Sequence, residues 1–94
     1  MRVAFTPLAE RQLQALHRYI AERSGIDRAD DYVGRIVTFC QNLGTFPIRG
    51  RSRDDLLPGL RTIGFERRAT IAFMVELIEG IYYGGQDYEA TFAV

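Results

Sequence analysis

The sequence FPIRGRSRDDLLPGLR, at residues 46–61, separates a part of the chain with helical periodicity from a part with strand periodicity. It contains four of the chain's twelve arginines, at positions 49, 51, 53 and 61. Guanidinium groups stay charged at physiological pH and bind oxyanions through paired donors. The segment therefore predicts a fold in two halves, with a loop at their junction that faces an anionic group.

The half before this segment predicts two helices. Thr6 is suited to cap the first helix and Pro7 to start it, while Ser24-Gly25 is suited to end it. The apolar stripe of this helix is expected to consist of Ala9, Leu13, Leu16 and Ile20.

The second helix is expected to begin near Asp27, with Asp30 and Asp31 in its first turn, and to stop at Gly44. Because the connection between the helices is short, they are expected to form an antiparallel hairpin. The predicted apolar stripe of the second helix consists of Ala29, Val33, Ile36, Cys40 and Leu43.

The half after the segment has the period of two that is typical of strands. Strands are predicted at 60–65, 68–78 and 81–83, with a tight turn at Glu79-Gly80 between the last two. A short strand is also expected at 1–5, whereas the tail at 86–94 has no clear period. One face of the strand at 68–78 is expected to carry Ile71, Phe73, Val75 and Leu77.

The resulting order, β-α-α-β-β-β, predicts an α+β fold in a single domain that spans residues 1–94. The helical hairpin must bury its apolar stripes against one face of a small, mainly antiparallel sheet. No helix is left in this scheme to cover the other face.

The composition limits the class of function. Twelve acidic residues balance twelve arginines, so the net charge is zero, and lysine is absent. Domains that bind nucleic acid are usually basic as a whole, so we expect no direct DNA binding by this chain alone. No apolar run approaches the roughly 18 residues that span a bilayer, and the lone Cys40 cannot form an internal disulfide. The sequence therefore predicts a cytoplasmic protein without membrane contact.

Several short motifs, in their order and spacing, resemble the RelE/ParE superfamily of toxins from type II toxin–antitoxin systems. The ParE branch is the closer match, and the resemblance covers nearly the whole chain. The motifs are Phe5-Thr6-Pro7-Leu8-Ala9-Glu10, Tyr19-Ile20-Ala21-Glu22, Phe46-Pro47, Gly50-Arg51-Ser52-Arg53-Asp54-Asp55-Leu56, Pro58-Gly59-Leu60-Arg61, Arg68 before Ile71, and Gly84-Gly85-Gln86-Asp87-Tyr88-Glu89.

This resemblance implies a RelE/ParE-like fold and a toxin that poisons its own bacterial cell unless an antitoxin is bound. ParE-like members, associated with plasmid stabilisation, inhibit DNA gyrase by binding and without chemistry of their own. Their antitoxin is typically a ParD-like ribbon-helix-helix protein whose C-terminal segment folds onto the toxin, which gives a hetero-oligomer. The family's C-terminus also suggests that the tail contacts the cellular target, through Asp87, Tyr88 and Phe92.

RelE-like members instead cut mRNA on the ribosome, and a ribonuclease of this kind is the alternative. Metal-free RNA cleavage needs a base, an acid and a cationic clamp on the phosphate. Arg61 and Arg68 are candidates for the clamp, but the lysine that RelE-like nucleases carry on the strand after the loop has no counterpart here. Tyrosines, with an ordinary pKa near ~10, are the remaining candidates for the acid and the base.

We therefore expect a protein that is not an enzyme, with no catalytic residues, no metal and no cofactor. The single histidine, His17, has no partner in the nearby sequence that would orient it for catalysis. A degenerate toxin that binds its partner and helps to regulate transcription is a third possibility.

Acidic side chains of an antitoxin are the anionic groups that the arginines are expected to receive. The predicted contacts are Arg49, Arg51, Arg53, Arg61 and Arg68. The apolar part of the interface is expected to come from Leu8, Tyr19, Val37, Phe39 and Met74. The alternative for the loop is a solvated segment in which Asp54 and Asp55 pair with neighbouring arginines.

Overall fold

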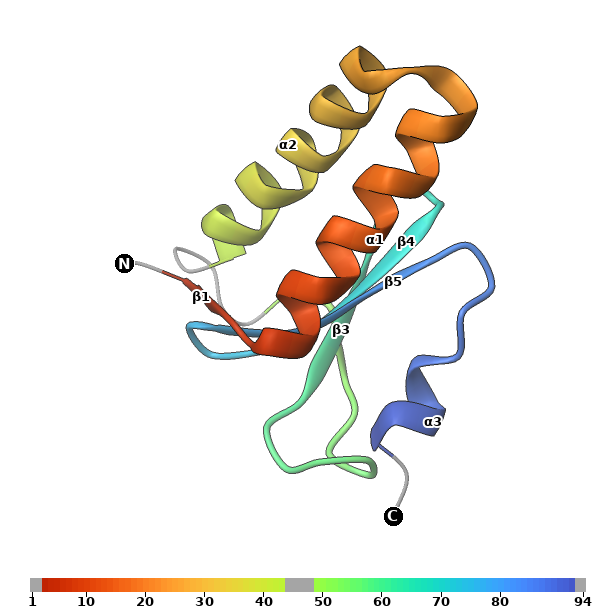
Figure 1. Ribbon diagram of the computed structural model, residues 1–94. Coiled ribbons are helices and arrows are strands. Elements are labelled where there is room, and N and C mark those ends of the chain that lie inside the picture. Colours follow the sequence, from red (N-terminus) through yellow and green to blue (C-terminus); the bar gives the residue numbers. More distant parts are fainter. Residues whose placement is uncertain (1–2, 44–48, 93–94) are drawn as a thin grey trace.

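Two helices pack on one face of a five-stranded sheet in the computed structural model, which describes residues 3–43 and 49–92 (Figure 1). The helices are α1 (Pro7–Ser24) and α2 (Ile26–Leu43), and a short helix α3 (Tyr88–Phe92) follows the last strand. The strands are β1 (Ala4–Phe5), β2 (Arg51–Ser52), β3 (Arg61–Phe65), β4 (Ala69–Met74) and β5 (Leu77–Tyr83).

The sheet has the strand order β1-β5-β4-β3-β2. β1 runs parallel to β5, and the other neighbouring pairs are antiparallel. The predicted α+β fold, with a helical hairpin on a mainly antiparallel sheet, is therefore confirmed. The sequence missed β2, which lies inside the arginine-rich segment and pairs with the start of β3.

The predicted ends of α1 are confirmed. Thr6 is the N-cap, and its Oγ1 accepts a hydrogen bond from the N–H of Ala9 at 3.1 Å. The same hydroxyl donates to the carbonyl of Glu79 in β5 at 3.1 Å, so the cap also attaches the helix to the sheet. Gly25 ends α1 with a φ of 95°, a conformation that glycine adopts without steric cost.

The helix α2 begins at Ile26, directly after Gly25. Asp27 lies in its first turn, whereas Asp30 and Asp31 follow that turn, so the prediction that placed Asp30 and Asp31 in the first turn is wrong. Gly25, with its positive φ, is the single residue between the two helices. The second helix therefore begins at Ile26, one residue before the predicted start at Asp27. The predicted stop at Gly44 and the Phe46-Pro47 motif lie outside the described residues.

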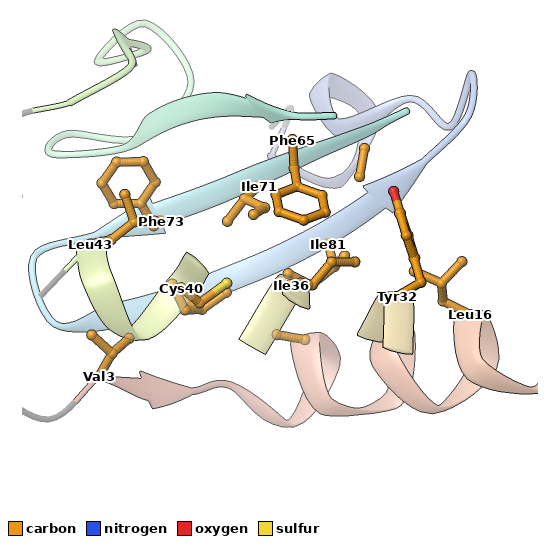
Figure 2. Close-up of a cluster of buried hydrophobic side chains, with 13 residues drawn as sticks. Val3, Leu16, Tyr32, Ile36, Cys40, Leu43, Phe65, Ile71, Phe73 and Ile81 are labelled. Carbon is orange, nitrogen blue, oxygen red and sulfur yellow. The ribbon is translucent and has the colours of Figure 1, made fainter. Parts of the chain in front are cut away.

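The main core lies between the helical hairpin and the sheet (Figure 2). Tyr32 takes a buried place on α2, while Val33 from the predicted stripe is half-buried. Each fully buried aliphatic or aromatic side chain stabilises the fold by about 1.5–3 kcal/mol. The buried residues of this cluster are Val3, Ala9, Leu16, Tyr32, Ile36, Cys40, Leu43, Phe65, Ala69, Ile71, Phe73, Ile78 and Ile81.

The prediction of one long strand at 68–78 is wrong, because the chain reverses within it. Met74 pairs with Leu77, so Val75 and Glu76 form the turn between β4 and β5. Glu76 adopts a positive φ of 65°, and Val75 is 61% exposed instead of facing the core. Val75-Glu76 contains no glycine or proline, so its sequence does not indicate a turn. The turn predicted at Glu79-Gly80 rested on a glycine that the fold needs for a different reason.

Glu79 and Gly80 lie inside β5, not in a turn. Ala72 pairs with Gly80 and Phe73 with Ile78, so Glu79 is the extra residue of a β-bulge. A Cβ atom on Gly80 would lie 2.6 Å from the Tyr82 ring and 2.6 Å from its hydroxyl oxygen. Glycine is needed here because the buried Tyr82 side chain covers the strand at this point.

The second face of the sheet is also covered, which corrects the prediction that no helix lies there. Leu60, Ala72 and Tyr82 form a small buried cluster on this face. Helix α3 packs against it and lies on the opposite side of the sheet from α1 and α2 (Figure 1). The half-buried residues around this cluster are Leu56, Leu57, Met74, Tyr88 and Phe92. Five residues are too few for α3 to show a helical period in the sequence.

The close approach of Tyr82 to Gly80 predicts the cost of adding one methyl group. Gly80→Ala is expected to lower the free energy of unfolding by about 1–3 kcal/mol, because the buried ring cannot move aside freely. Gly64→Ala in β3 is the matched control, since a Cβ there meets nothing within 4 Å. Urea denaturation followed by circular dichroism measures both variants. Equal stability of the two variants would contradict the steric account of Gly80.

The core position of Cys40 predicts an unreactive thiol. Burial raises the pKa of Cys40 from 9.0 to about 12. At pH 9 an ordinary thiol is therefore half ionised, whereas about one Cys40 in a thousand is a thiolate in the folded protein. We expect iodoacetamide at pH 9 to leave the native protein largely unmodified over the time that alkylates the urea-unfolded protein completely, as measured by mass spectrometry. Comparable alkylation rates in the two states would exclude a closed core around Cys40.

Candidate functional site

The arginines predicted to form one anion-binding surface lie in two separate places. Arg61 begins β3 and packs near the loop, whereas Arg68 lies at the far end of the same hairpin, in the turn before β4. The predicted phosphate clamp of Arg61 and Arg68 is therefore not formed. Each place has its own geometry and its own partners.

Arg53 joins the loop to helix α3. Its Nε and Nη2 donate to the two carboxylate oxygens of Asp55 at 3.0 and 2.8 Å. Its Nη1 donates to the hydroxyl of Tyr88 at 2.6 Å, and Nη2 also donates to Glu89 at 2.7 Å. The Arg53 side chain is 13% exposed, so the donors of its guanidinium group are used within the chain.

The Arg53 cluster is electrostatically matched. Hydrogen bonds to Asp55 and Glu89 raise the pKa of Arg53 above its ordinary value, and the hydrogen bond from Arg53 lowers the pKa of Asp55. Because the Asp55 pKa is lowered on folding, the pair contributes stability at neutral pH and loses it as the pH falls through that lowered pKa. The alternative of local pairing thus holds for Asp55, whereas Asp54 accepts from the N–H of Gly59 at 2.8 Å.

Arg61 also serves the fold of the loop. Its Nε donates to the carbonyl of Arg49 at 2.8 Å and its Nη2 to the carbonyl of Gly50 at 3.2 Å. Arg49 and Arg51 are exposed, and the Arg49 guanidinium lies over the Phe39 ring, 5.6 Å from its centroid. Of the predicted loop contacts, Arg49 and Arg51 are the two that present their charge to solvent.

Arg68 lies in a pocket of about 560 Å³, where the ends of both helices meet the β3–β4 turn and the end of β5. The nearby Tyr83 side chain raises the pKa of Arg68 above its ordinary value. We call this site the tyrosine–arginine pocket. The residues that define it are Tyr19, Arg23, Arg28, Tyr32, Arg68 and Tyr83.

One arginine of the pocket rim is fully paired. Arg35 donates to both carboxylate oxygens of Glu66 at 2.9 and 3.0 Å, and it also pairs with Asp31 one turn earlier on α2. These contacts raise the pKa of Arg35, and the hydrogen bond from Arg35 lowers the pKa of Glu66. The rim acids are therefore satisfied by Arg35 and do not pair with the other arginines of the site.

The predicted apolar contacts do not form one surface. Tyr19 is 45% exposed and forms a wall of the pocket, while Leu8 and Val37 are half-buried on α1 and α2. Phe39 packs edge-on against Phe65 in the main core, with 5.2 Å between ring centroids. Met74 packs against the second cluster, on the other face of the sheet. Their role in antitoxin binding stays a prediction.

The residues predicted to contact the target build helix α3. The Asp87 carboxylate accepts from the N–H groups of Glu89 and Ala90 at 3.0 and 3.3 Å and so caps the helix. Tyr88 and Phe92 pack against the second cluster and are half-buried. Contact of the tail with a target stays a prediction.

The single histidine does not line the tyrosine–arginine pocket. His17 Nε2 lies 2.7 Å from Asp30 Oδ1, in a contact that joins α1 to α2. Within residues 3–43 and 49–92, no three His, Cys, Asp or Glu side chains are grouped to hold a metal ion. Over the same residues, no helix has the length and apolar content to cross a membrane.

The site also contains residues that were not predicted to lie together: Arg23, Arg28, Tyr32 and Tyr83. Arg23 and Arg28 flank the interhelical turn at Gly25, so the predicted helical hairpin already implies that these two arginines lie close together. Tyr32 and Tyr83 join them through the packing of α2 on β5, which no local signal reports.

The contacts of Arg53 predict that it keeps α3 ordered. Arg53→Gln is expected to speed amide hydrogen exchange of residues 84–92 several-fold, because α3 loses its ties to the loop. Arg51→Gln is the control, since Arg51 is exposed in the neighbouring strand β2. Hydrogen exchange read by mass spectrometry distinguishes them. Unchanged exchange in Arg53→Gln would mean that apolar packing alone holds the helix.

The chain matches known proteins over most of its length. The family model described as "ParE toxin of type II toxin-antitoxin system, parDE" matches residues 3–83. Toxin ParE3 of Caulobacter vibrioides is 38% identical over 61 residues, which cover 65% of this chain and 61% of that protein. A solved structure described as "Chromosomal ParDE TA system from P. aeruginosa" matches with a TM-score of 0.73 and 26% identity, covering 89% of this chain and 96% of that one. The chain belongs to the ParE toxin family of type II toxin–antitoxin systems, within the RelE/ParE superfamily.

Proposed function

We propose that this toxin inhibits DNA gyrase by binding, without chemistry of its own, and that a ParD-like ribbon-helix-helix antitoxin holds it inactive in the bacterial cytoplasm. Membership in the ParE family supports the inhibitor and antitoxin roles. The similar P. aeruginosa structure is that of a ParDE system, which also supports an antitoxin partner and a hetero-oligomer.

The engagement of Arg53 and Arg61 within the fold is the observation that carries the non-enzymatic part. A ribonuclease needs cationic donors that are free to meet a phosphate as charge develops on it. Arg53 already donates to Asp55, Tyr88 and Glu89, and Arg61 donates to two backbone carbonyls. Binding a phosphate there would require breaking contacts that hold the loop and α3 in place.

Exposed charge and exposed aromatic surface support a protein as the partner. Arg49 and Arg51 are exposed, and the Arg49 guanidinium lies over the half-buried Phe39 ring, which is a suitable setting for carboxylates of a docking peptide. Tyr19 and Arg68 provide a similar combination at the pocket. The proposed antitoxin contacts are therefore Arg49, Arg51, Tyr19 and Arg68, together with the half-buried Leu8 and Val37.

Two assays run in parallel test the proposed function. The purified toxin is added to a gyrase supercoiling reaction and to a ribosome-dependent translation reaction with labelled mRNA. We expect supercoiling to be inhibited and the mRNA to stay intact, because the donors of Arg53 and Arg61 are already used within the fold. Addition of the antitoxin in slight molar excess is expected to restore supercoiling, and toxin mixed with antitoxin beforehand is the control.

Cleaved mRNA with normal supercoiling would reject the inhibitor role and assign the chain to the ribonuclease branch. Activity in neither assay, with tight antitoxin binding retained, would indicate a degenerate toxin. Cleavage of mRNA would thus exclude the non-enzymatic role, whereas inactivity in both assays would exclude gyrase inhibition and leave the antitoxin partner in place.

A further inference from the structure

We infer that the tyrosine–arginine pocket receives a carboxylate side chain from the antitoxin segment that folds onto the toxin. The inference rests on the proposed function and assigns to this pocket the most specific polar contact of the interface. The pocket lies on the helical side of the sheet, at the open end formed by Arg23, Arg28 and the β3–β4 turn.

The charge balance of the pocket favours an anion. Four arginines line it against two acids, Asp31 and Glu66, which leaves a local charge of 4 − 2 = +2. Arg35 pairs with both acids. Among the described residues, Arg23, Arg28 and Arg68 have no carboxylate within ion-pairing distance. An entering carboxylate would therefore meet cations that no acidic side chain of residues 3–43 and 49–92 neutralises.

The buried hydroxyl of Tyr32 also favours an anionic ligand. Tyr32 is 9% exposed, and its Oη is buried without a hydrogen-bond partner among residues 3–43 and 49–92. Its side chain extends from α2 toward the sheet, with the oxygen at the far end (Figure 2). A buried hydroxyl without a partner costs about 1–3 kcal/mol, and a ligand that accepts a hydrogen bond from it recovers that cost.

Tyr32 is a donor at physiological pH. Burial, followed by the nearby Tyr83 and Glu66, raises the pKa of Tyr32 above 10. The phenol therefore keeps its proton and can donate a hydrogen bond to a carboxylate. A hydrogen bond to a charged acceptor is stronger than one between neutral groups, which makes this contact selective for an acidic side chain.

The aromatic walls of the pocket suit a peptide ligand. Tyr19 and Tyr83 have ring centroids 6.0 Å apart, and Tyr83 lies 5.9 Å from Tyr32. The Arg23 guanidinium lies over the Tyr19 ring at 4.5 Å, which fixes one edge. The aliphatic stem of a glutamate, or a neighbouring apolar side chain, can pack on these rings while the carboxylate meets the arginines.

A nucleic acid is a poorer occupant than an acidic peptide. Asp31 and Glu66 stand at the rim and would repel a chain of phosphates, and the whole protein has no net charge. A single carboxylate carries one negative charge and therefore meets less repulsion from these acids than a chain of phosphates does. The pocket volume of about 560 Å³ holds a few side chains.

The inference is tested by antitoxin affinity, measured by isothermal titration calorimetry with full-length toxin and antitoxin. Tyr32→Phe is expected to weaken binding about tenfold or more, because it removes one hydrogen bond to a charged group and little else. Arg28→Gln and Arg68→Gln are expected to weaken binding by a similar factor. Each variant is first checked for native circular dichroism, which Tyr32→Phe should retain since it keeps the ring.

Two matched controls separate the pocket from general effects. Tyr82→Phe also removes a buried hydroxyl without a partner in the described structure, but on the opposite face of the sheet. Arg11→Gln removes one exposed arginine from α1 outside the pocket. Both controls are expected to bind the antitoxin as tightly as the unaltered toxin.

A double-mutant cycle identifies the carboxylate. Each Asp or Glu of the antitoxin's docking segment is changed to Asn or Gln, and one change is expected to cost less affinity in the Tyr32→Phe toxin than in the unaltered toxin. Full additivity at every acidic position would overturn the inference.

The outcomes distinguish the inference from the proposed function. If the unaltered toxin binds no antitoxin, the antitoxin role fails and the inference fails with it. If it binds, and the pocket variants bind as tightly as Arg11→Gln, the inference fails and the proposed function stands. Resonance shifts of pocket residues on addition of inorganic phosphate, with equal antitoxin affinity in all variants, would assign the pocket to a phosphate ligand and overturn the inference.

Discussion

The rest of the structure depends on the bulge in β5 and on two side chains that bind to it, one from the N-cap of α1 and one from α1 itself. β1 pairs with β5 as far as Ile78, and beyond this point the chain has turned into α1. The carbonyl of Glu79 and the N–H of Ile81 then need other partners, and they receive the Thr6 hydroxyl and the Gln12 amide oxygen at 3.1 and 2.7 Å. These bonds fix the position of the helical hairpin on the sheet and thus the shape of the core.

The arginines divide into those that build the fold and those that face outward. Arg35, Arg53 and Arg61 hold segments together that are distant in sequence, and each uses several donors of its planar fork. Lysine could not replace them, since a single ammonium group has no such geometry. The arginine-rich loop is thus a structural junction at Arg53 and Arg61 and an exposed cationic surface at Arg49 and Arg51.

The features that local chemistry determines could be predicted from the sequence. Thr6-Pro7 and Gly25 gave the limits of α1, and the spacing of Ile36, Cys40 and Leu43 gave the buried face of α2. The turn at Val75-Glu76 could not be predicted, because its residues have no turn preference and the pairing of β4 with β5 imposes it. Helix α3 and the tyrosine–arginine pocket depend on contacts between distant segments, so no stretch of sequence contains them.

The bulge at Glu79 also limits errors during folding. β4 is apolar on both faces, with Ile71 and Phe73 in one cluster and Ala72 in the other. Hydrophobicity alone would therefore discriminate weakly against pairing β4 and β5 one residue out of step, since each slipped strand would still bury apolar side chains. A slipped pairing would move the bulge away from Thr6 and Gln12 and leave backbone groups unsatisfied. Thr6 at the cap of α1 and Gln12 within α1 thus select the correct alignment of β4 with β5.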